Sequence, residues 1–368
     1  MNPFYSTKEN EYRHLRCGVG LMDWRHLSKV QVTGTDAVDL VNRLVISDVS
    51  KLAPGRLAST YMLDTGGRIF ADTYVWNQGN AWLMISEGPA ARDVLEHIRA
   101  CAGLPRRAET QDLTADKALF GVDGPFAWQL VGELVGEDVL RLRYLDAMPG
   151  RTLAGVNVDI LRAGKTGEFG YLVLCPMTAA RTIWEALLQA GKDFDAVPCG
   201  IEALELCKLE NGFLNLRREG ARAHNALELN CRSLLCRAKT DYIGKEATER
   251  TLSAGIKRHI VRICLEDGGA IPVYPGATVK YRGEVIGEIA SADYSFMLGH
   301  EIALAFLDWE YAFAGCPYDV QTDGGLRAAR TVSAPFVFNN SLKVGPRDNF
   351  FAVHWSLGLS PVTETCPV

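Results

Sequence analysis

The sequence predicts an α+β protein, with helices and antiparallel hairpins over its first two thirds and a small antiparallel β-barrel or sandwich after about residue 250. Residues 59–76, "STYMLDTGGRIFADTYVW", are typical of a β-hairpin that turns at Gly66-Gly67. The first two thirds lack the regular strand–helix alternation that a dinucleotide-binding fold requires. Beyond residue 250, short apolar strands are separated by Gly and Pro turns, as in small all-β domains.

The body is expected to begin with a strand, a turn and a helix. Residues 26–34 alternate between apolar and polar side chains before a turn, and Thr35 or Asp36 is expected to cap a helix that runs to Val45. The hairpin follows. The later elements expected in the body are strands at 79–86, 116–124, 155–164 and 169–176, and helices at 88–100, 125–134, 177–191 and 201–213.

The C-terminal part is expected to contain only strands. Their segments are 259–266, 277–291, 300–308, 318–322 and 329–338. We therefore divide the chain into a body at 1–250, a barrel domain at 257–340 and an irregular tail at 341–368.

Composition limits the functional classes. The chain has 368 residues and a formal net charge of −5, so charge gives no reason to expect nucleic acid or a membrane surface as partner. No run of about 18 apolar residues occurs, and the first residues lack a signal-peptide core, so we expect a cytoplasmic protein. The 10 cysteines include no Cys-x-x-Cys pair, so we expect reduced thiols and no metal site.

Two carboxylates stand beside Gly-containing turns between apolar strands. Glu168 lies in "RAGKTGEFGY" (162–171), and Asp72 follows the hairpin turn. A carboxylate at the end of a strand is usually solvated. In a shielded site, however, it can accept two parallel N–H bonds from a flat heterocycle such as a pterin. Both interpretations stay open for each residue.

The neighbours of these carboxylates give weaker signals. Strand alternation places Phe70, Tyr74 and Trp76 on the same face as Asp72, with Ile69 and Ala71 opposite. The "GKTG" segment precedes a strand and is not a phosphate loop, so Lys165 is expected to be solvated. No serine or cysteine is placed to use His26 as a base, and we interpret this histidine as structural.

A series of motifs, taken together and in order, resembles a known family as far as about residue 340. "RAGKTGEFGY" is similar to RTGYTGEDGF, "GVDGPFA" to LQGPKA, and "PCGIEALELCKLENG" to PCGLGARDSLRLEAG. The others are the opening segment at 21–56, the hairpin, and the C-terminal motifs "DYIGKEA" and "IGEIASADYSFMLGHEIALAFL". The family is that of the folate-dependent aminomethyltransferases, which comprises the glycine cleavage T-protein and tetrahydrofolate-dependent demethylases.

This resemblance implies a T-protein-like body with a central channel and a barrel packed on one side. Tetrahydrofolate is the implied cofactor, with its pterin on Glu168 and its reactive nitrogen near a catalytic Asp72. The cofactor-binding residues implied by the matching motifs are Glu168, Trp76, Tyr171, Glu210 and Lys208.

Several positions depart from the T-protein pattern. Lys165 replaces a Tyr, Leu204 and Lys208 replace arginines, and "NCRSLLCR" (230–237) replaces a Gly-Leu-Gly-Trp segment. The folate side is retained and the donor side is altered. We therefore expect a demethylase that moves a methyl group from a small N-, O- or S-methylated compound to tetrahydrofolate. The alternatives are an aminomethyltransferase of glycine cleavage, with its lipoyl protein as partner, and a folate-binding protein without transfer activity.

Overall fold

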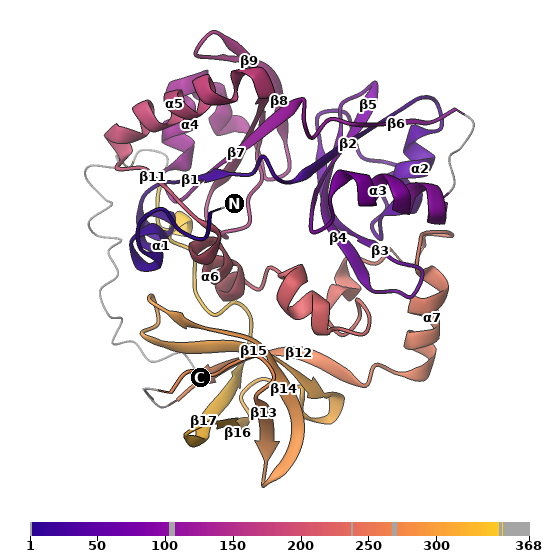
Figure 1. Cartoon of the computed structure of the whole chain (residues 1–368), viewed down its shortest axis with the longest axis vertical. Coiled ribbons are helices and arrows are strands. Elements are labelled where there is room, and N and C mark those ends of the chain that lie inside the picture. The colour runs from indigo at the N-terminus through magenta and orange to yellow at the C-terminus, as the bar shows by residue number, and fades with distance from the viewer. Residues whose placement is uncertain (1, 103–106, 237, 267–270, 346–347, 349–368) are drawn as a thin grey trace.

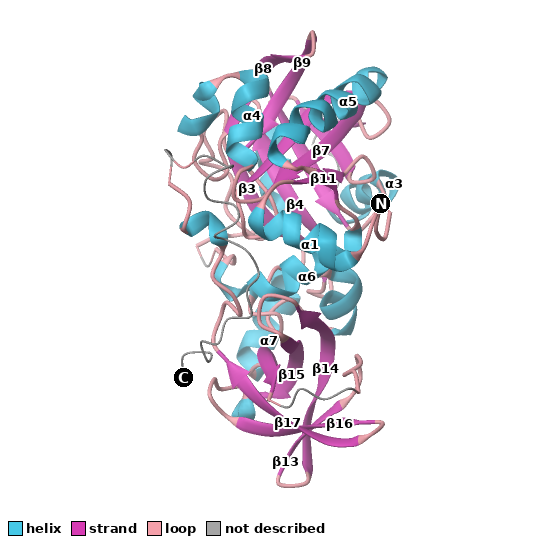
Figure 2. Cartoon of the chain, turned by 90° about the vertical axis from the view of Figure 1, so that its left-hand side faces the viewer, coloured by secondary structure: helices cyan, strands magenta, loops and turns pink. Residues whose placement is uncertain are grey.

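The computed structural model describes residues 2–102, 107–236, 238–266, 271–345 and 348. Two antiparallel-rich sheets with their helices lie side by side, and a closed β-barrel lies below them (Figure 1). The expected α+β fold with a C-terminal barrel is confirmed, and the domain is a barrel rather than a sandwich. In the side view, helix α6 (Ile201–Asn211) lies between the sheets and the barrel (Figure 2).

The first sheet has the strand order β3-β4-β5-β2-β6 and contains the expected hairpin as β3 and β4. One face is covered by α2 and α3, whose Leu40, Leu44 and Val94 are buried against Val32 and Val75 of the sheet. The elements are β2 (Ser28–Thr33), α2 (Ala37–Leu44), β3 (Leu57–Leu63), β4 (Ile69–Asn77), β5 (Ala81–Glu87), α3 (Ala91–His97) and β6 (Glu109–Asp112).

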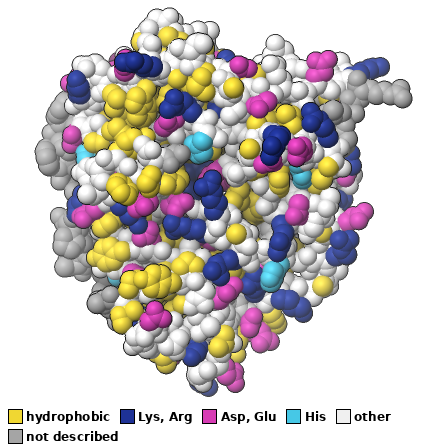
Figure 3. All heavy atoms as spheres, in the orientation of Figure 1, with side chains coloured by type: hydrophobic (Ala, Val, Ile, Leu, Met, Phe, Trp, Pro, Cys, Tyr) yellow, Lys and Arg dark blue, Asp and Glu magenta, His cyan; other side chains and the backbone are white. Residues whose placement is uncertain are grey.

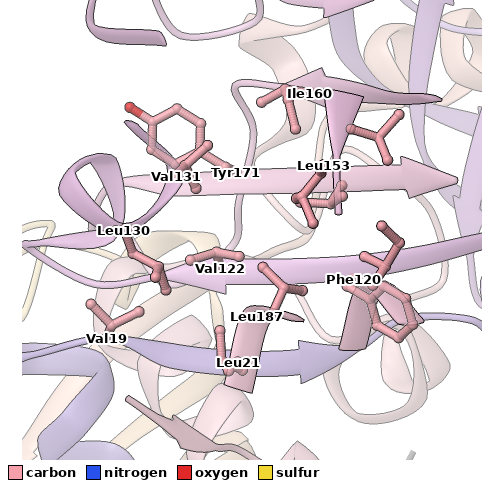
Figure 4. Close-up of a cluster of buried hydrophobic side chains, with 14 of the residues drawn as sticks. Val19, Leu21, Phe120, Val122, Leu130, Val131, Leu153, Ile160, Tyr171 and Leu187 are labelled. Carbon is pink, nitrogen blue, oxygen red and sulfur yellow. The ribbon is translucent and has the colours of Figure 1, made fainter. Parts of the chain in front are cut away.

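The second sheet has the order β11-β1-β7-β10-β9-β8. Its outer face is buried under α4 and α5 through Leu130, Val131 and Leu187, which meet Val122 and Tyr171 (Figure 4). The elements are β1 (Gly20–Asp23), β7 (Lys117–Asp123), α4 (Ala127–Val135), β8 (Ala147–Leu153), β9 (Val156–Leu161), β10 (Gly170–Pro176), α5 (Ala180–Gly191) and β11 (Val197–Pro198).

The barrel closes in the order β12-β15-β14-β13-β16-β17, and β12 pairs with β17, so its strands leave no open sheet edge. Its strands are β12 (Arg258–Leu265), β13 (Thr278–Tyr281), β14 (Glu284–Ser295), β15 (His300–Asp308), β16 (Pro317–Thr322) and β17 (Gly325–Val332). After the barrel, a short 3-10 turn at Asn340–Leu342 brings the chain back to the body. Most of the expected tail, 346–347 and 349–368, lies outside the described residues.

The structure differs from the expectations in several places. Helices α1 (Lys8–Cys17) and α7 (Lys245–Ala254) were not predicted. The α4 helix begins at Ala127, two residues after Pro125. A register shift in the β3–β4 pair leaves Phe70 without a paired residue, and its ring stacks on His97 at 4.2 Å. Because this bulge reverses the alternation locally, Phe70 does not share the face of Asp72.

Acidic and basic side chains are interspersed over the face in Figure 3, so this face carries no extended patch of one charge. Among the described residues, no helix is both long enough and apolar enough to span a bilayer.

Candidate functional site

The turn between β9 and β10 carries Lys165 and Glu168, and both side chains are buried. Glu168 faces two elements that lie far from it in the sequence. Arg16 of α1 donates from Nη1 to Glu168 Oε1 at 3.1 Å. Of the two interpretations left open for Glu168, the solvated carboxylate is excluded, because the side chain is buried and a cation compensates its charge inside the protein.

The chain segment after the barrel completes the partners of Glu168. The backbone N–H of Asn340 donates to Oε1 at 3.1 Å, and the N–H of Ser341 donates to Oε2 at 2.7 Å. The Ser341 hydroxyl also donates to Oε2, at 2.6 Å, and accepts from the N–H of Phe169 at 2.8 Å. Two neighbouring N–H groups thus take one carboxylate oxygen each, which is the pattern of donors that a pterin edge presents.

Glu210 is held by structural partners. Its Oε1 accepts from the hydroxyls of Tyr12 and Ser295, both at 2.6 Å, and its Oε2 accepts from Arg16 Nε at 3.1 Å. The side chains of Arg16, Glu168 and Glu210 are all fully buried. Arg16 thus joins α1, the Glu168 turn and α6, and the role of Glu210 toward folate remains a prediction.

Asp72 lies on β4 with its carboxylate buried against Lys165. Lys165 Nζ forms an ion pair with Asp72 Oδ2 and lies 5.2 Å from the centroid of the Tyr74 ring. Asp72 and Lys165 are 5% and 3% exposed, so the expectation of a solvated lysine is wrong. The lysine that replaces the family's Tyr therefore adds a positive charge directly beside the predicted catalytic carboxylate.

A second ion pair lies next to the first. Glu87 is directly opposite Asp72 in the β4–β5 register, and Lys208 Nζ donates to Glu87 Oε1 at 2.8 Å. Burial opposes ionisation of Glu87, but Lys208 and then Lys165 outweigh it and hold the pKa of this carboxyl below its usual value. The predicted cofactor ligand Lys208 is thus already paired, and the two neighbouring ion pairs place two cations and two anions beside one another.

Two cavities share the chain segment that ends α6. Asn211 and Phe213 line the first cavity, and Gly212 and Leu214 line the second. The first, about 420 Å³, we call the folate cavity. Its other lining residues are Tyr144, Arg162, Gly164, Gly167, Glu168, Phe169, Asn339, Ser341 and Leu342.

The second cavity, about 240 Å³, we call the donor cavity. Its other lining residues are Tyr61, Leu229, Asn230, Cys231, Ser233, Leu234, Ile260, Val261, Arg262 and Leu304. It lies close to Asp72, because Tyr61 is the direct strand partner of Asp72. Burial and, next, the charge of Asp72 raise the pKa of the Cys231 thiol to about 12. The segment 230–237, singled out in the sequence as a replacement on the donor side, is described as far as residue 236 and contributes four residues to the lining of this cavity.

Two further predicted ligands lie outside these linings. Trp76 is 2% exposed in the core that also contains Tyr74, and its indole N–H is buried without a partner among the described residues. Tyr171 is buried on β10 under the guanidinium of Arg162, 4.7 Å from the ring centroid. Contact of either side chain with folate remains a prediction.

Asp123 was not singled out from the sequence. It lies behind the Glu168 turn, where Thr166 Oγ1 donates to its Oδ1 at 2.8 Å and its Oδ2 is buried without a partner among the described residues. Burial raises the pKa of this carboxyl to about 7. The signal was present, since Asp123 is a charged residue at the end of the apolar run "ALFGVD". Arg16 and Glu87 gave no such signal.

His97 Nδ1 lies 3.6 Å from Cys101 Sγ, but across the described part of the chain no group of three or more His, Cys, Asp or Glu side chains is arranged to hold a metal ion. None of the described cysteines forms a disulfide.

Comparison with known proteins bears on these features. Residues 2–239 match the model of the GCVT N-terminal domain, and residues 258–337 match the glycine cleavage T-protein C-terminal barrel domain. The chain belongs to the glycine cleavage T-protein family. The GCVT-type body contains both sheets and those lining residues of the two cavities that lie at or before residue 234. Arg262 and Leu304, which also line the donor cavity, come from the barrel.

Similar proteins in this family carry aminomethyltransferase names. The chain is 30% identical over 339 residues to the aminomethyltransferase of Symbiobacterium thermophilum, covering 90% of each chain. It is 31% identical over 338 residues to the probable aminomethyltransferase of Natronomonas pharaonis, covering 90% of this chain and 91% of the other. The fold matches the glycine cleavage system aminomethyltransferase T of Bartonella henselae with a TM-score of 0.78 at 19% identity, covering 91% and 94% of the two chains.

Aminomethyltransferases of this family depend on tetrahydrofolate, and the chain is a one-carbon transferase that uses this cofactor. The residues present fit it. A buried carboxylate that already accepts two adjacent N–H groups borders a cavity with apolar and aromatic walls.

Proposed function

We propose that the chain transfers a one-carbon unit to tetrahydrofolate bound in the folate cavity, from a donor bound in the donor cavity, with Asp72 as the catalytic residue. The observation that carries the proposal is the position of Asp72. It contacts Lys165, on the turn that also carries Glu168, and its strand partner Tyr61 lines the donor cavity. One buried carboxylate is thus close to both cavities.

When bound, tetrahydrofolate supplies the nitrogen that accepts the one-carbon unit. In this proposal Glu168 binds the pterin edge, so the N–H groups of Asn340 and Ser341 have to leave its two oxygens. Tyr144, Phe213 and Arg162 then line the rest of the folate cavity. This exchange replaces one pair of N–H donors by another, and Arg16 continues to compensate the charge of Glu168.

Asp72 places a carboxylate at the donor side, and its ion pair with Lys165 holds this carboxylate in one orientation while compensating its net charge. Holding the donor carbon and the acceptor in register can contribute up to ~7–11 kcal/mol. A preorganised charge can add roughly 3–4 kcal/mol. Orientation is therefore the larger contribution, and Asp72 the smaller one.

The names of the relatives favour an aminomethyl donor. One relative is named an aminomethyltransferase and the other a probable aminomethyltransferase, at 30% and 31% identity over nine tenths of this chain. With this donor, the partner implied by the family resemblance is the lipoyl protein of glycine cleavage. We therefore rank this function above the demethylase that we predicted from the sequence, because neither of these two relatives is named a demethylase.

The ion pairs favour a second candidate, a demethylase. Lys165 neutralises Asp72 and Lys208 neutralises Glu87, so the donor side has little net charge to attract a cationic aminomethyl group. Such a site suits a methylated donor that is neutral or anionic.

Turnover with defined donors separates the candidates. The chain would be mixed with tetrahydrofolate and either aminomethylated lipoyl protein or a panel of small N-, O- and S-methylated compounds. Methylenetetrahydrofolate plus ammonia from the first mixture identifies an aminomethyltransferase, and methyltetrahydrofolate from the second identifies a demethylase. If tetrahydrofolate binds and neither product forms, the chain is a folate-binding protein and the proposed transfer is wrong.

A further inference from the structure

The donor cavity contains an arginine without an anionic partner. Arg262 on β12 lines the cavity, and its Nε is buried without a hydrogen-bond partner. In the described part of the chain it forms no ion pair, and its guanidinium carbon lies 6.0 Å from the centroid of the Phe336 ring. Gly212 allows this position, because a Cβ there would lie 1.7 Å from Arg262 Nη2.

Three other arginines with little solvent exposure, in contrast, have anionic partners. Arg16 pairs with Glu168 and Glu210, Arg258 with Glu228, and Arg327 with Glu301. Arg262 has no such compensation, and burial alone lowers the pKa of its guanidinium. An uncompensated charge in a shielded place is unfavourable unless something else supplies the counter-charge.

The neighbours of Arg262 make the cavity suitable for a small anion. The lining contains no carboxylate, and Asn230 and Ser233 add neutral polar groups to apolar walls. Its volume of about 240 Å³ admits a small organic acid. A guanidinium binds a carboxylate through two parallel N–H bonds, which also fixes the orientation of the bound molecule.

We propose that Arg262 binds the carboxylate of the one-carbon donor, so that the donor is a small organic acid whose transferable group points toward Asp72. The identification of the bound acid as the one-carbon donor rests on the proposed function. The anion site itself rests on the unpaired Arg262 alone. It also specifies the charge of the donor, because Asp72, the strand partner of the lining residue Tyr61, is neutralised by Lys165.

A matched pair of probes tests the anion site without any turnover. Methoxyacetate and its uncharged amide, 2-methoxyacetamide, have nearly the same size and differ in charge. Binding of each would be measured by calorimetry and by the shift in melting temperature, with inorganic phosphate as a second anion. We expect methoxyacetate to bind, and both the amide and phosphate to bind at least 10-fold more weakly.

Variants then locate the site. Arg262→Gln should weaken methoxyacetate binding roughly 10- to 100-fold, because charge-assisted bonds are lost, and Arg262→Lys should retain part of the affinity. Arg222→Gln is the control, since Arg222 pairs with Glu288 outside the cavity. The melting temperature of Arg262→Gln without probe should not fall, because no internal ion pair is broken.

Three results would overturn the inference. They are equal binding of methoxyacetate and its amide, equal binding of phosphate, or unchanged methoxyacetate binding in both Arg262 variants. Tetrahydrofolate binding would be titrated in the same proteins and is expected to change less than about threefold in Arg262→Gln, because Glu168 lies in the other cavity. Failure of the wild type to bind tetrahydrofolate would refute the proposed function. The anion site would still be tested by the binding of methoxyacetate.

Discussion

Removing the Ser341 hydroxyl should strengthen tetrahydrofolate binding. In Ser341→Ala the backbone N–H bond to Glu168 remains, but the hydroxyl bond of 2.6 Å is lost, and the N–H of Phe169 loses its acceptor. A hydrogen bond to a charged group contributes about 1.5–3 kcal/mol. The contact that has to open before a pterin reaches Glu168 is weakened by this amount.

The affinity follows from the fraction of molecules in which the segment is open. If the closed segment predominates, the apparent Kd equals the intrinsic Kd divided by the open fraction. A loss of about 1.5–3 kcal/mol of closure then lowers the apparent Kd about 10- to 100-fold. We expect the lower end, because Asn340 keeps its own bonds to Glu168 and to the backbone oxygen of Arg16.

The assay is a calorimetric titration with tetrahydrofolate under reducing conditions. Ser333→Ala serves as control, because Ser333 is exposed on the same connection after β17. An unchanged or weaker affinity in Ser341→Ala, with the control equal to wild type, would refute the idea that the pterin and the segment compete for Glu168.

Three further predictions concern the buried charges. Asp72→Asn should lower single-turnover transfer roughly 100- to 1000-fold and also lower the melting temperature, because Lys165 is left unpaired; adding Lys165→Met should restore the melting temperature but not the rate. Burial raises the pKa of Asp123 to about 7, so the native state keeps a proton that the unfolded state loses near pH 4, and stability should fall as pH rises between these values. Asp123→Asn should remove up to about 2.6 kcal/mol of that fall between pH 5 and pH 8, measured by urea unfolding at these two pH values. Arg16→Met should reduce the free energy of unfolding by about 3–5 kcal/mol in the same assay, because it leaves two buried glutamates uncompensated.

Each of these predictions has an outcome that contradicts it. Near-wild-type transfer by Asp72→Asn would exclude Asp72 as the catalytic residue. An Asp123→Asn protein whose stability still falls between pH 5 and 8 as steeply as wild type would assign that fall to other groups. An Arg16→Met protein as stable as wild type would show that water or a rearranged partner compensates the two carboxylates.

Local sequence patterns determined the elements of this protein. The Gly-Gly turn between two apolar runs predicted the hairpin of β3 and β4, and Asn211-Gly212 predicted the end of α6, where Gly212 has a φ of +74°. These features depend on residues a few positions apart, which is the range over which turn and capping chemistry acts. The order of motifs likewise indicated the family, because each motif is a continuous segment.

The partners of the site residues were decided only by the tertiary structure. Glu168 meets Arg16 and Ser341, 152 and 173 positions away, and Asp72 meets Lys165, 93 positions away. Charge in the sequence does not say which distant group will lie within bonding distance, because that depends on how two sheets and a barrel pack. The same packing leaves Arg262 unpaired beside the donor cavity while it pairs other shielded arginines, since no carboxylate lies on the walls that enclose this guanidinium.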